Sequence, residues 1–315
     1  MPKQKDTHTN HNIYADIDEL RRLQYLAKGF SFLPRQPVSS VLSGKYVSKL
    51  RGRGLNFEEL RHYRPGDDVR SMDWKVTRRT GKPHIKVYTE ERERNVYLAI
   101  DQRNTMFFGS TSKMKSVIAA EIAALMAWRV ADTGDRVGAV VYGDDSIHVI
   151  PAKRGRQHVV NVLIEIVKQN NKLKVGAQGN HSSDSFNKML AKLTQVSGNN
   201  ALVILIGDGH GWNNKSTDFI KKIRQHNEVI ACHVHDPLEQ ELPEMPQMVV
   251  SDGEQQIQFS SHDAGIREKY KTELERQLNT YAETAKKYRI PLLSITTVLP
   301  VEQQLRKALG GVVVK

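Results

Sequence analysis

Two carboxylates follow apolar segments of strand length, and together they have the chemistry of a cation site. Asp101 comes directly after Val96–Ile100, and Asp208 lies two residues beyond Ala201–Ile206. Thr105 adds a hydroxyl close to the first of them. Carboxylate and hydroxyl oxygens are the hard ligands that Mg²⁺ prefers. Asp101, Thr105 and Asp208 therefore predict a weak Mg²⁺ site, and the alternative is that the two carboxylates only cap the helices that follow them.

Arg103 opposes a metal at this position. It stands two residues after Asp101, and its guanidinium keeps its charge and offers no lone pair to a metal ion. We expect it to pair with the carboxylates and to supply the positive charge itself. If it points outward instead, the three oxygen ligands remain available to Mg²⁺. Ser183 and Asp184, just before a later helix, are expected near the same site.

The elements that must position these residues alternate along the chain from residue 96 to residue 309. Hydrophobic periodicity predicts strands at Val96–Ile100, Arg136–Tyr142, Ser146–Ile150, Ala201–Ile206, Val229–His233 and Leu292–Thr297. It predicts helices at Lys113–Asp132, Gln157–Gln169, Ser185–Val196, Thr217–His226, 264–289 and Val301–Leu309, and a short hairpin at 245–260. This alternation predicts an α/β fold with a doubly wound, mostly parallel, Rossmann-like sheet. Ligands bind beyond the carboxyl ends of the strands in such sheets, where both carboxylates fall.

The chain divides into three parts in this interpretation. Residues 1–12 are polar and are expected to be disordered. Residues 13–95 are expected to form a helix over Ile17–Phe30 and a small β-rich module that includes a strand at Ile85–Thr89. Residues 96–315 are expected to form the main α/β domain.

The charge balance bounds the kinds of partner. The chain has 47 Lys and Arg against 35 Asp and Glu, a formal net charge of +12, and its basic residues are densest from Lys45 to Arg94. Such an excess suits an acidic protein surface, anionic lipid or nucleic acid. The apolar runs are far shorter than the roughly 20 residues that cross a bilayer. Cys232 is the single cysteine, which fits a reducing compartment. A cytoplasmic protein without membrane insertion is therefore expected.

The segment after residue 95 resembles the first half of a von Willebrand factor A domain. Asp101-Gln102-Arg103-Asn104-Thr105 is followed by an alanine-rich helix and then by Gly134-Asp135-Arg136-Val137-Gly138. The resemblance implies a metal-ion-dependent adhesion site, written D-x-S-x-S, with a Thr and an Asp from two later loops. This version is degenerate, because Arg103 replaces the first Ser. Thr105 fits the second Ser, Asp184 or a neighbouring serine falls at the Thr, and Asp208 fits the final Asp.

A second resemblance covers the basic stretch. Residues 52–75 read GRGLNFEELRHYRPGDDVRSMDWK, with Gly81 and an acidic Thr89-Glu90-Glu91 after them. This resembles the signature of a bacterial family, domain of unknown function 58, whose members also carry an A-type domain. The resemblance implies an adaptor without enzymatic activity that works with a MoxR-type AAA+ ATPase in the assembly or activation of other proteins.

The signature stretch supports two interpretations of its own side chains. Its acidic and basic residues can form an internal network of ion pairs that holds a small unit together. Its arginines and aromatic residues can instead form a recognition surface, since these types are enriched at interaction hot spots. The expected interaction surface comprises Arg61, Tyr63, Arg64, Asp67, Asp68, Arg70, Asp73, Trp74 and Lys75.

Two other functions compete with the adaptor. The basic 45–94 stretch interleaves aromatic residues that can stack on bases, although no nucleic-acid motif is present, so nucleic acid is the less favoured partner. A phosphatase of the haloacid dehalogenase type would use Asp101 as nucleophile, but it needs a second Asp where Arg103 stands. No phosphate-binding loop of the G-x-x-x-x-G-K-[ST] type occurs, so the chain is not itself the ATPase.

Overall fold

The chain folds into two compact units, one of residues 1–35 with 94–315 and one of residues 36–93. A computed structural model describes residues 11–28, 55–65, 67–90, 94–175, 183–240, 244–246, 248–251, 256–260 and 263–309. The expectation of disorder for residues 1–12 falls almost wholly outside these ranges. We call the first unit the sheet domain and the second the signature module.

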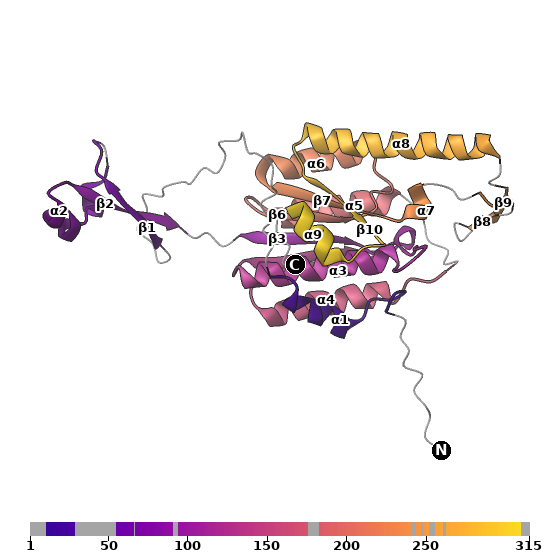
Figure 1. Ribbon diagram of the computed structural model, residues 1–315, viewed down its shortest axis with the longest axis horizontal. Helices are drawn as coiled ribbons and strands as arrows, with labels where there is room; N and C mark the ends of the chain where they lie inside the picture. The colour runs from indigo at the N-terminus through magenta and orange to yellow at the C-terminus, as the bar shows by residue number, and fades with distance from the viewer. Residues whose placement is uncertain are drawn as a thin grey trace, which may run out of the picture. The chain divides into compact units, whose positions relative to one another are not determined.

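The sheet domain is built on six strands in the order β10-β7-β6-β3-β4-β5. Figure 1 labels β10, β7, β6 and β3 among them. Their bounds are β3 Asn95–Asp101, β4 Arg136–Tyr142, β5 Ile147–Lys153, β6 Leu202–Gly207, β7 Glu228–His235 and β10 Leu292–Thr296. All neighbours pair in parallel except β5, which runs antiparallel to β4 at one edge. The order reverses at β3, which pairs with β4 on one side and β6 on the other, as in doubly wound folds. The predicted fold class is confirmed.

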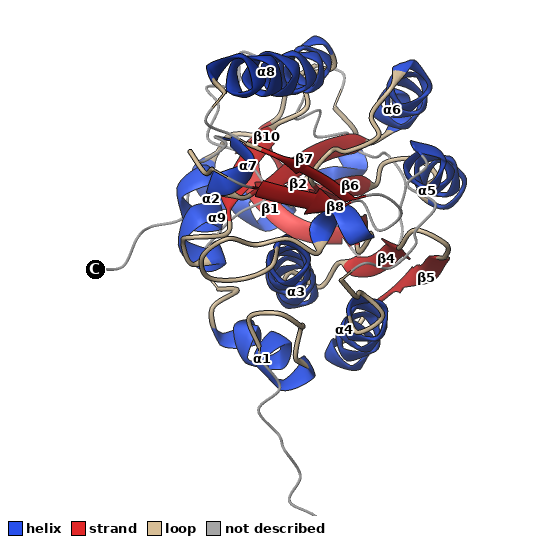
Figure 2. Cartoon of the chain, turned by 90° about the vertical axis from the view of Figure 1, so that its right-hand side faces the viewer, coloured by secondary structure: helices blue, strands red, loops and turns tan. Residues whose placement is uncertain are grey.

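Helices cover both faces of this sheet (Figure 2). One face packs against α3 Lys115–Asp132, α4 Arg156–Asn170 and α9 Val301–Leu309, and the other against α5 Ser183–Val196, α6 Asn214–His226 and α8 Ala264–Lys287. Alternation along β3 divides the core, because Val96, Leu98 and Ile100 join the first face and Tyr97 and Ala99 the second. Short segments complete the domain: α1 Ile17–Arg22, η1 Leu23–Tyr25, η3 Asn104–Met106, α7 Pro237–Gln240, β8 Met248–Ser251 and β9 Gln256–Phe259.

The first helix belongs to the sheet domain, whereas it was expected to form one part with the β-rich module; the second unit instead begins at residue 36 and ends at residue 93. Asp16 caps α1 through its side chain, and Leu20 within the helix is almost fully buried. The indole Nε1 of Trp128 on α3 donates to the Leu20 carbonyl oxygen at 3.0 Å. Burial of this apolar face against α3 and α4 holds the helix on the sheet domain rather than on the module. The helix is also shorter than the predicted Ile17–Phe30, whose last two residues lie outside the described ranges.

The signature module is a two-stranded sheet with a short helix. β1 Leu55–His62 pairs antiparallel with β2 His84–Glu90, which contains the strand predicted at Ile85–Thr89. Between them lie η2 Val69–Ser71 and α2 Trp74–Thr80. Gly81 ends α2 in a left-handed conformation at φ 70°, which glycine adopts without a Cβ penalty. The sequence predicted neither β1 nor α2.

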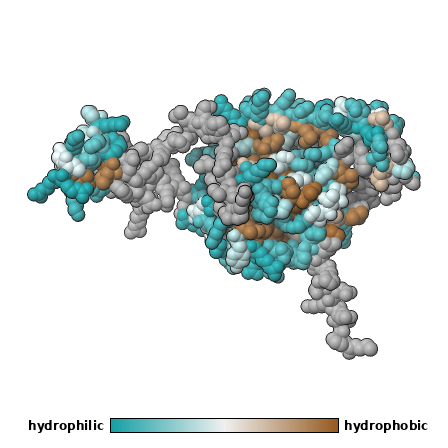
Figure 3. All heavy atoms as spheres, viewed as in Figure 1, coloured by the Kyte–Doolittle hydropathy of each residue, from teal (hydrophilic) through white to brown (hydrophobic). Residues whose placement is uncertain are grey.

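The described helices do not include a membrane-spanning candidate: none is both long enough and apolar enough. Figure 3 shows a mostly hydrophilic surface on the face of the signature module that it presents.

Candidate functional site

The carboxyl edge of the sheet brings the two predicted carboxylates together. Asp101 is the last residue of β3, and Asp208 follows β6, its neighbour in the sheet. Gly207 makes this approach possible, because a Cβ on it would lie 2.8 Å from the Asp101 Cβ and 3.0 Å from its Oδ2. Any side chain at position 207 would therefore displace the Asp101 carboxylate.

Arg103 lies between these carboxylates. Its Nε donates to Asp101 Oδ1 at 2.9 Å and its Nη2 to Asp101 Oδ2 at 2.6 Å, a bidentate pair. The same Nη2 donates to the His210 carbonyl oxygen at 3.0 Å and lies 3.5 Å from Asp208 Oδ1. Only 3% of Arg103 is exposed. The guanidinium thus joins the end of β3 to the loop after β6.

Aromatic rings enclose the same guanidinium. Its central carbon lies 5.3 Å from the ring centre of Tyr142 at the end of β4 and 5.7 Å from that of Phe186 on α5. Burial lowers the pKa of Arg103, but Asp101, Tyr142 and Asp208 together outweigh it, so the pKa of Arg103 is raised. Burial also raises the pKa of Tyr142, so its hydroxyl stays protonated. Arg103 is therefore a permanent cation inside the protein.

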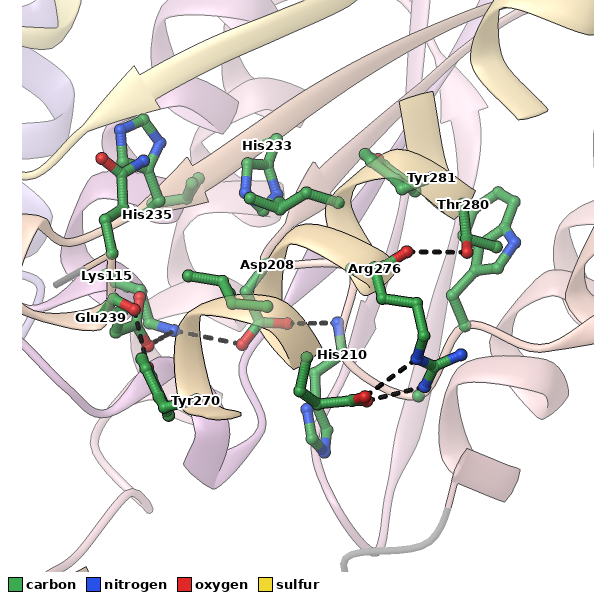
Figure 4. Close-up of a pocket in the computed structure, with 18 residues that line it drawn as sticks. Lys115, Asp208, His210, His233, His235, Glu239, Tyr270, Arg276, Thr280 and Tyr281 are labelled. Atoms are coloured by element: carbon green, nitrogen blue, oxygen red, sulfur yellow. Dashed lines mark hydrogen bonds and ion pairs between the residues drawn. The ribbon is translucent and has the colours of Figure 1, made fainter. Parts of the chain in front are cut away.

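Lys115 supplies a second buried cation. It opens α3, is 2% exposed, and places Nζ 3.2 Å from Asp208 Oδ2 and 2.5 Å from Glu239 Oε1 (Figure 4). Burial would raise the pKa of Asp208, but Lys115 and then Arg103 outweigh it and hold the pKa well below its ordinary value. We call Asp101, Arg103, Lys115, Asp208 and Glu239 the edge cluster.

The edge cluster does not fit a Mg²⁺ ion. Two cations face three carboxylates, which leaves a net charge of −1 within the set. Both oxygens of Asp101 are engaged by Arg103, and Asp208 lies between the two cations. Of the predicted metal ligands, Thr105 keeps a buried hydroxyl without a hydrogen-bond partner, and one hydroxyl is too few to hold the ion. Arg103 occupies the cation's place.

The ion pair that the structure shows for Asp184, another predicted site residue, is not with the edge cluster. Asp184 is exposed in the first turn of α5, where it pairs with Lys188 at 2.6 Å. Ser183 begins that helix, and its side chain lies outside the described part of the chain. The sequence interpretation missed Lys115 and Glu239. The signal for Lys115 was slight, since it is one of two lysines just before the alanine-rich helix.

A cavity of about 490 Å³ adjoins the edge cluster beneath α8 (Figure 4). Lys115, Asp208 and Glu239 line it together with aromatic side chains that include Trp212 and Tyr281. The rings of these two aromatic residues meet edge to face, with centres 5.0 Å apart. This volume lies in the range of small-molecule pockets.

His233 also lines this cavity. Its buried Nδ1 has no hydrogen-bond partner, and burial lowers the pKa of its imidazole to about 4. The imidazole is therefore neutral at physiological pH.

In the signature module, the acidic residues of the predicted surface are used internally. Asp67 accepts two hydrogen bonds from Arg61, at 2.9 and 2.8 Å, and these bonds lower the pKa of its carboxyl. Asp68 accepts from the Arg70 backbone and so caps η2. Asp73 caps α2 and pairs with Lys86 at 3.2 Å. The internal-network interpretation therefore fits these acidic residues and Arg61.

The remaining cations of the module behave differently. The side chains of Arg64, Arg70, Lys75, Arg78 and Arg79 are exposed and form no ion pair within the described ranges. Trp74 of the same module is 66% exposed, whereas Tyr63 is half-buried. The recognition-surface interpretation therefore fits these cations and Trp74.

Comparison with solved structures finds von Willebrand factor A-type neighbours at low identity. A conserved hypothetical protein, BatB from Bacteroides thetaiotaomicron, matches with a TM-score of 0.39 at 14% identity and covers 69% of this chain and 97% of its own. The SpRpn10 VWA domain matches with a TM-score of 0.40 at 11% identity, over 71% of this chain and 100% of its own.

Sequence comparison gives closer relatives and a family. The uncharacterized proteins Mb1516 of Mycobacterium bovis and Rv1480 of Mycobacterium tuberculosis are each 27% identical over 292 residues, which is 92% of this chain and 89% of theirs. Residues 59–280 match the family described as "Protein of unknown function DUF58", and this range includes most of the signature module and the edge cluster. The chain belongs to the DUF58 family.

Proposed function

We propose that this protein is a docking protein that binds other proteins and does not catalyse a reaction. The observation that carries the proposal is the set of exposed cations in the signature module that form no ion pair with any described residue, together with the exposed Trp74. Arginine and tryptophan are the residue types most enriched at binding hot spots. If these cations only stabilised the module, we would expect them to form ion pairs with its carboxylates. Arg61 forms such a pair with Asp67.

The edge cluster supports the same proposal by its chemistry. A phosphatase would need Asp101 free as a nucleophile and a nearby carboxylic acid as proton donor. Arg103 holds both Asp101 oxygens and stands at the position of that acid. The cluster has the character of a structural anchor for the loops at the sheet edge.

The partner that we propose is a MoxR-type AAA+ ATPase, in keeping with the resemblance noted in the sequence. In this proposal the ATPase performs the hydrolysis, and this chain connects it to the protein that is assembled or activated. In this proposal the signature module contacts the ATPase, and the loops around the edge cluster are available for the other protein.

The test is direct binding of the full chain to the MoxR-type ATPase of the same organism. Biolayer interferometry with ATP, with ADP and without nucleotide is expected to show binding that is strongest with ATP. A variant with Arg64→Ala and Arg70→Ala is expected to bind more weakly, while the matched Lys221→Ala and Lys222→Ala pair on α6, also exposed, is expected to bind normally.

Two results would overturn the proposal. Absence of binding in all three nucleotide states would reject the ATPase as partner. Turnover of p-nitrophenyl phosphate that Asp101→Asn abolishes would show that the protein is an enzyme.

A further inference from the structure

The exposed side of α2 concentrates positive charge around one aromatic ring. Trp74 and Arg78 are four residues apart, as are Lys75 and Arg79, so each pair is adjacent on the helix surface. All four side chains are exposed, whereas Val76 and Thr77 between them are partly buried. We call Trp74, Lys75, Arg78 and Arg79 the α2 face.

Helix stability accounts for only part of this arrangement. Arg78 and Arg79 lie in the last turn, where positive charge is favourable to the helix dipole. Lys75 lies in the first turn, where positive charge is unfavourable, and it repels Arg79 one turn later. A lysine in this place weakens the helix slightly and has no carboxylate among the described residues to compensate it.

Two described carboxylates of the module are engaged away from the α2 face. Asp73 is the nearest acidic residue in sequence. One of its oxygens accepts hydrogen bonds from the backbone N–H groups of Lys75 and Val76, and the other forms an ion pair with Lys86. Asp67 is held by Arg61. No carboxylate among the described side chains pairs with the α2 face, so its charge is suited to an acidic partner.

We infer that the α2 face binds an acidic segment of a partner protein, with Trp74 against an apolar side chain of that segment and the three cations on its carboxylates. The inference rests on the proposed docking function and names the chemistry of the partner. A protein is favoured over single-stranded nucleic acid because nucleic-acid binding uses several stacked aromatic rings. Trp74 is the one aromatic side chain strongly exposed among those described in the module.

The experiment measures fluorescence anisotropy of a labelled twelve-residue peptide of Glu and Asp with one central Phe, added to the full chain. The α2 variant carries Lys75→Glu, Arg78→Glu and Arg79→Glu. Its control carries Lys215→Glu, Lys221→Glu and Lys222→Glu on α6, which changes the net charge equally on another exposed helix. We expect the α2 variant to bind at least about tenfold more weakly and the control to bind within about threefold of the native chain.

Three further measurements sharpen the result. Trp74→Ala is expected to weaken peptide binding about tenfold without changing the melting temperature. A neutral variant, Lys75→Gln with Arg78→Gln and Arg79→Gln, is expected to behave like the reversed one, and hydrogen exchange of residues 74–80 verifies that α2 is intact in it. An oligothymidine of the same net charge is expected to bind more weakly than the peptide.

The outcomes separate this inference from the proposed function. If the α6 control loses as much affinity as the α2 variant, or if oligothymidine binds more tightly through the same residues, the inference is wrong. If the ATPase binds the native chain and the α2 variant equally, the inference fails and the docking function stands. If the peptide binds through the α2 face but the ATPase does not bind, the ATPase is the wrong partner and the inference stands.

Discussion

The edge cluster and the α2 face use arginine in opposite ways. In the edge cluster, Arg103 is buried and makes a bidentate pair with Asp101 and a bond to a backbone carbonyl. On the α2 face, Arg79 is exposed and has no partner among the described residues. The first arrangement holds the loops of one domain together, because removing either partner leaves a buried charge. The second contributes little to the free energy of unfolding and is free to act in binding.

The largest expected difference between the units is in stability. Arg103→Ala leaves Asp101 uncompensated in the interior and is expected to lower the free energy of unfolding by about 3–5 kcal/mol. Arg79→Ala is expected to change it by less than about 0.5 kcal/mol. Urea denaturation of both variants measures the contrast. Equal effects would show that Arg103 is not held as the ion pairs indicate.

The second largest effect is expected from acid, which destabilises the sheet domain through the buried His233. The pKa of His233 is about 4 in the fold against 6.5 as its ordinary value. As the pH falls, the His233 imidazole is therefore protonated in the unfolded chain before it is protonated in the fold. The free energy of unfolding decreases between pH 6.5 and 4 by about 3 kcal/mol, since each pKa unit corresponds to about 1.4 kcal/mol. The melting temperature of His233→Gln is expected to depend less on pH across this range than that of the native chain. The control His226→Gln, at an exposed position on α6, is expected to keep the native dependence. An unchanged slope in His233→Gln would contradict this.

A smaller effect is expected from converting the edge cluster into a metal site. Without Arg103 the set holds one cation and three carboxylates, a net charge of −2 that a divalent ion can balance. Arg103→Ser is therefore expected to gain Mg²⁺ binding, stabilising the chain by about 2–3 kcal/mol when Mg²⁺ is at a hundred times its Kd. Melts in Mg²⁺ and in EDTA measure it, with the native chain expected to show no difference. Micromolar Mg²⁺ binding by the native chain that Asp101→Ala removes would show that the cluster accepts a metal as it is.

The smallest effect is expected on the α2 face. Lys75→Glu relieves the repulsion from Arg79 and suits the helix dipole, so α2 is expected to gain up to about 0.5 kcal/mol. Hydrogen exchange of residues 74–80 measures this gain. A loss of protection would mean that Lys75 stabilises the module through a contact of its own.

The sequence predicted the sheet domain better than the module, for a physical reason. β3 and β6 are buried on both faces, so they appear as continuous apolar runs, and α3 appears as an alanine-rich period. β1, with the sequence LNFEELRH, lacks such a run, and α2 has only seven residues, most of them polar. Short elements in a small unit depend on local caps such as Asp73 and on pairing across the hairpin, and these have weak sequence signals.

In the edge cluster, the sequence predicted the contact between residues close in the chain and missed the contacts between distant ones. Arg103 and Asp101 are two residues apart, so their pairing could be expected from the sequence. Lys115 meets Asp208 across 93 positions and Glu239 across 124. A lysine at a helix start is usually exposed, and only the strand order brings these carboxylates to it. Asp184 was expected near the cluster because its helix begins at the same sheet edge, but its side chain faces solvent.

Position 207 requires glycine because the fold has no room for a Cβ there. The Asp101 carboxylate packs where a Cβ of residue 207 would be. Even alanine at position 207 would displace the Asp101 carboxylate that binds Arg103. We therefore expect this position to be among the least tolerant of substitution in the chain. A survey of all single substitutions would find this intolerance at a residue that has no side chain to form any bond.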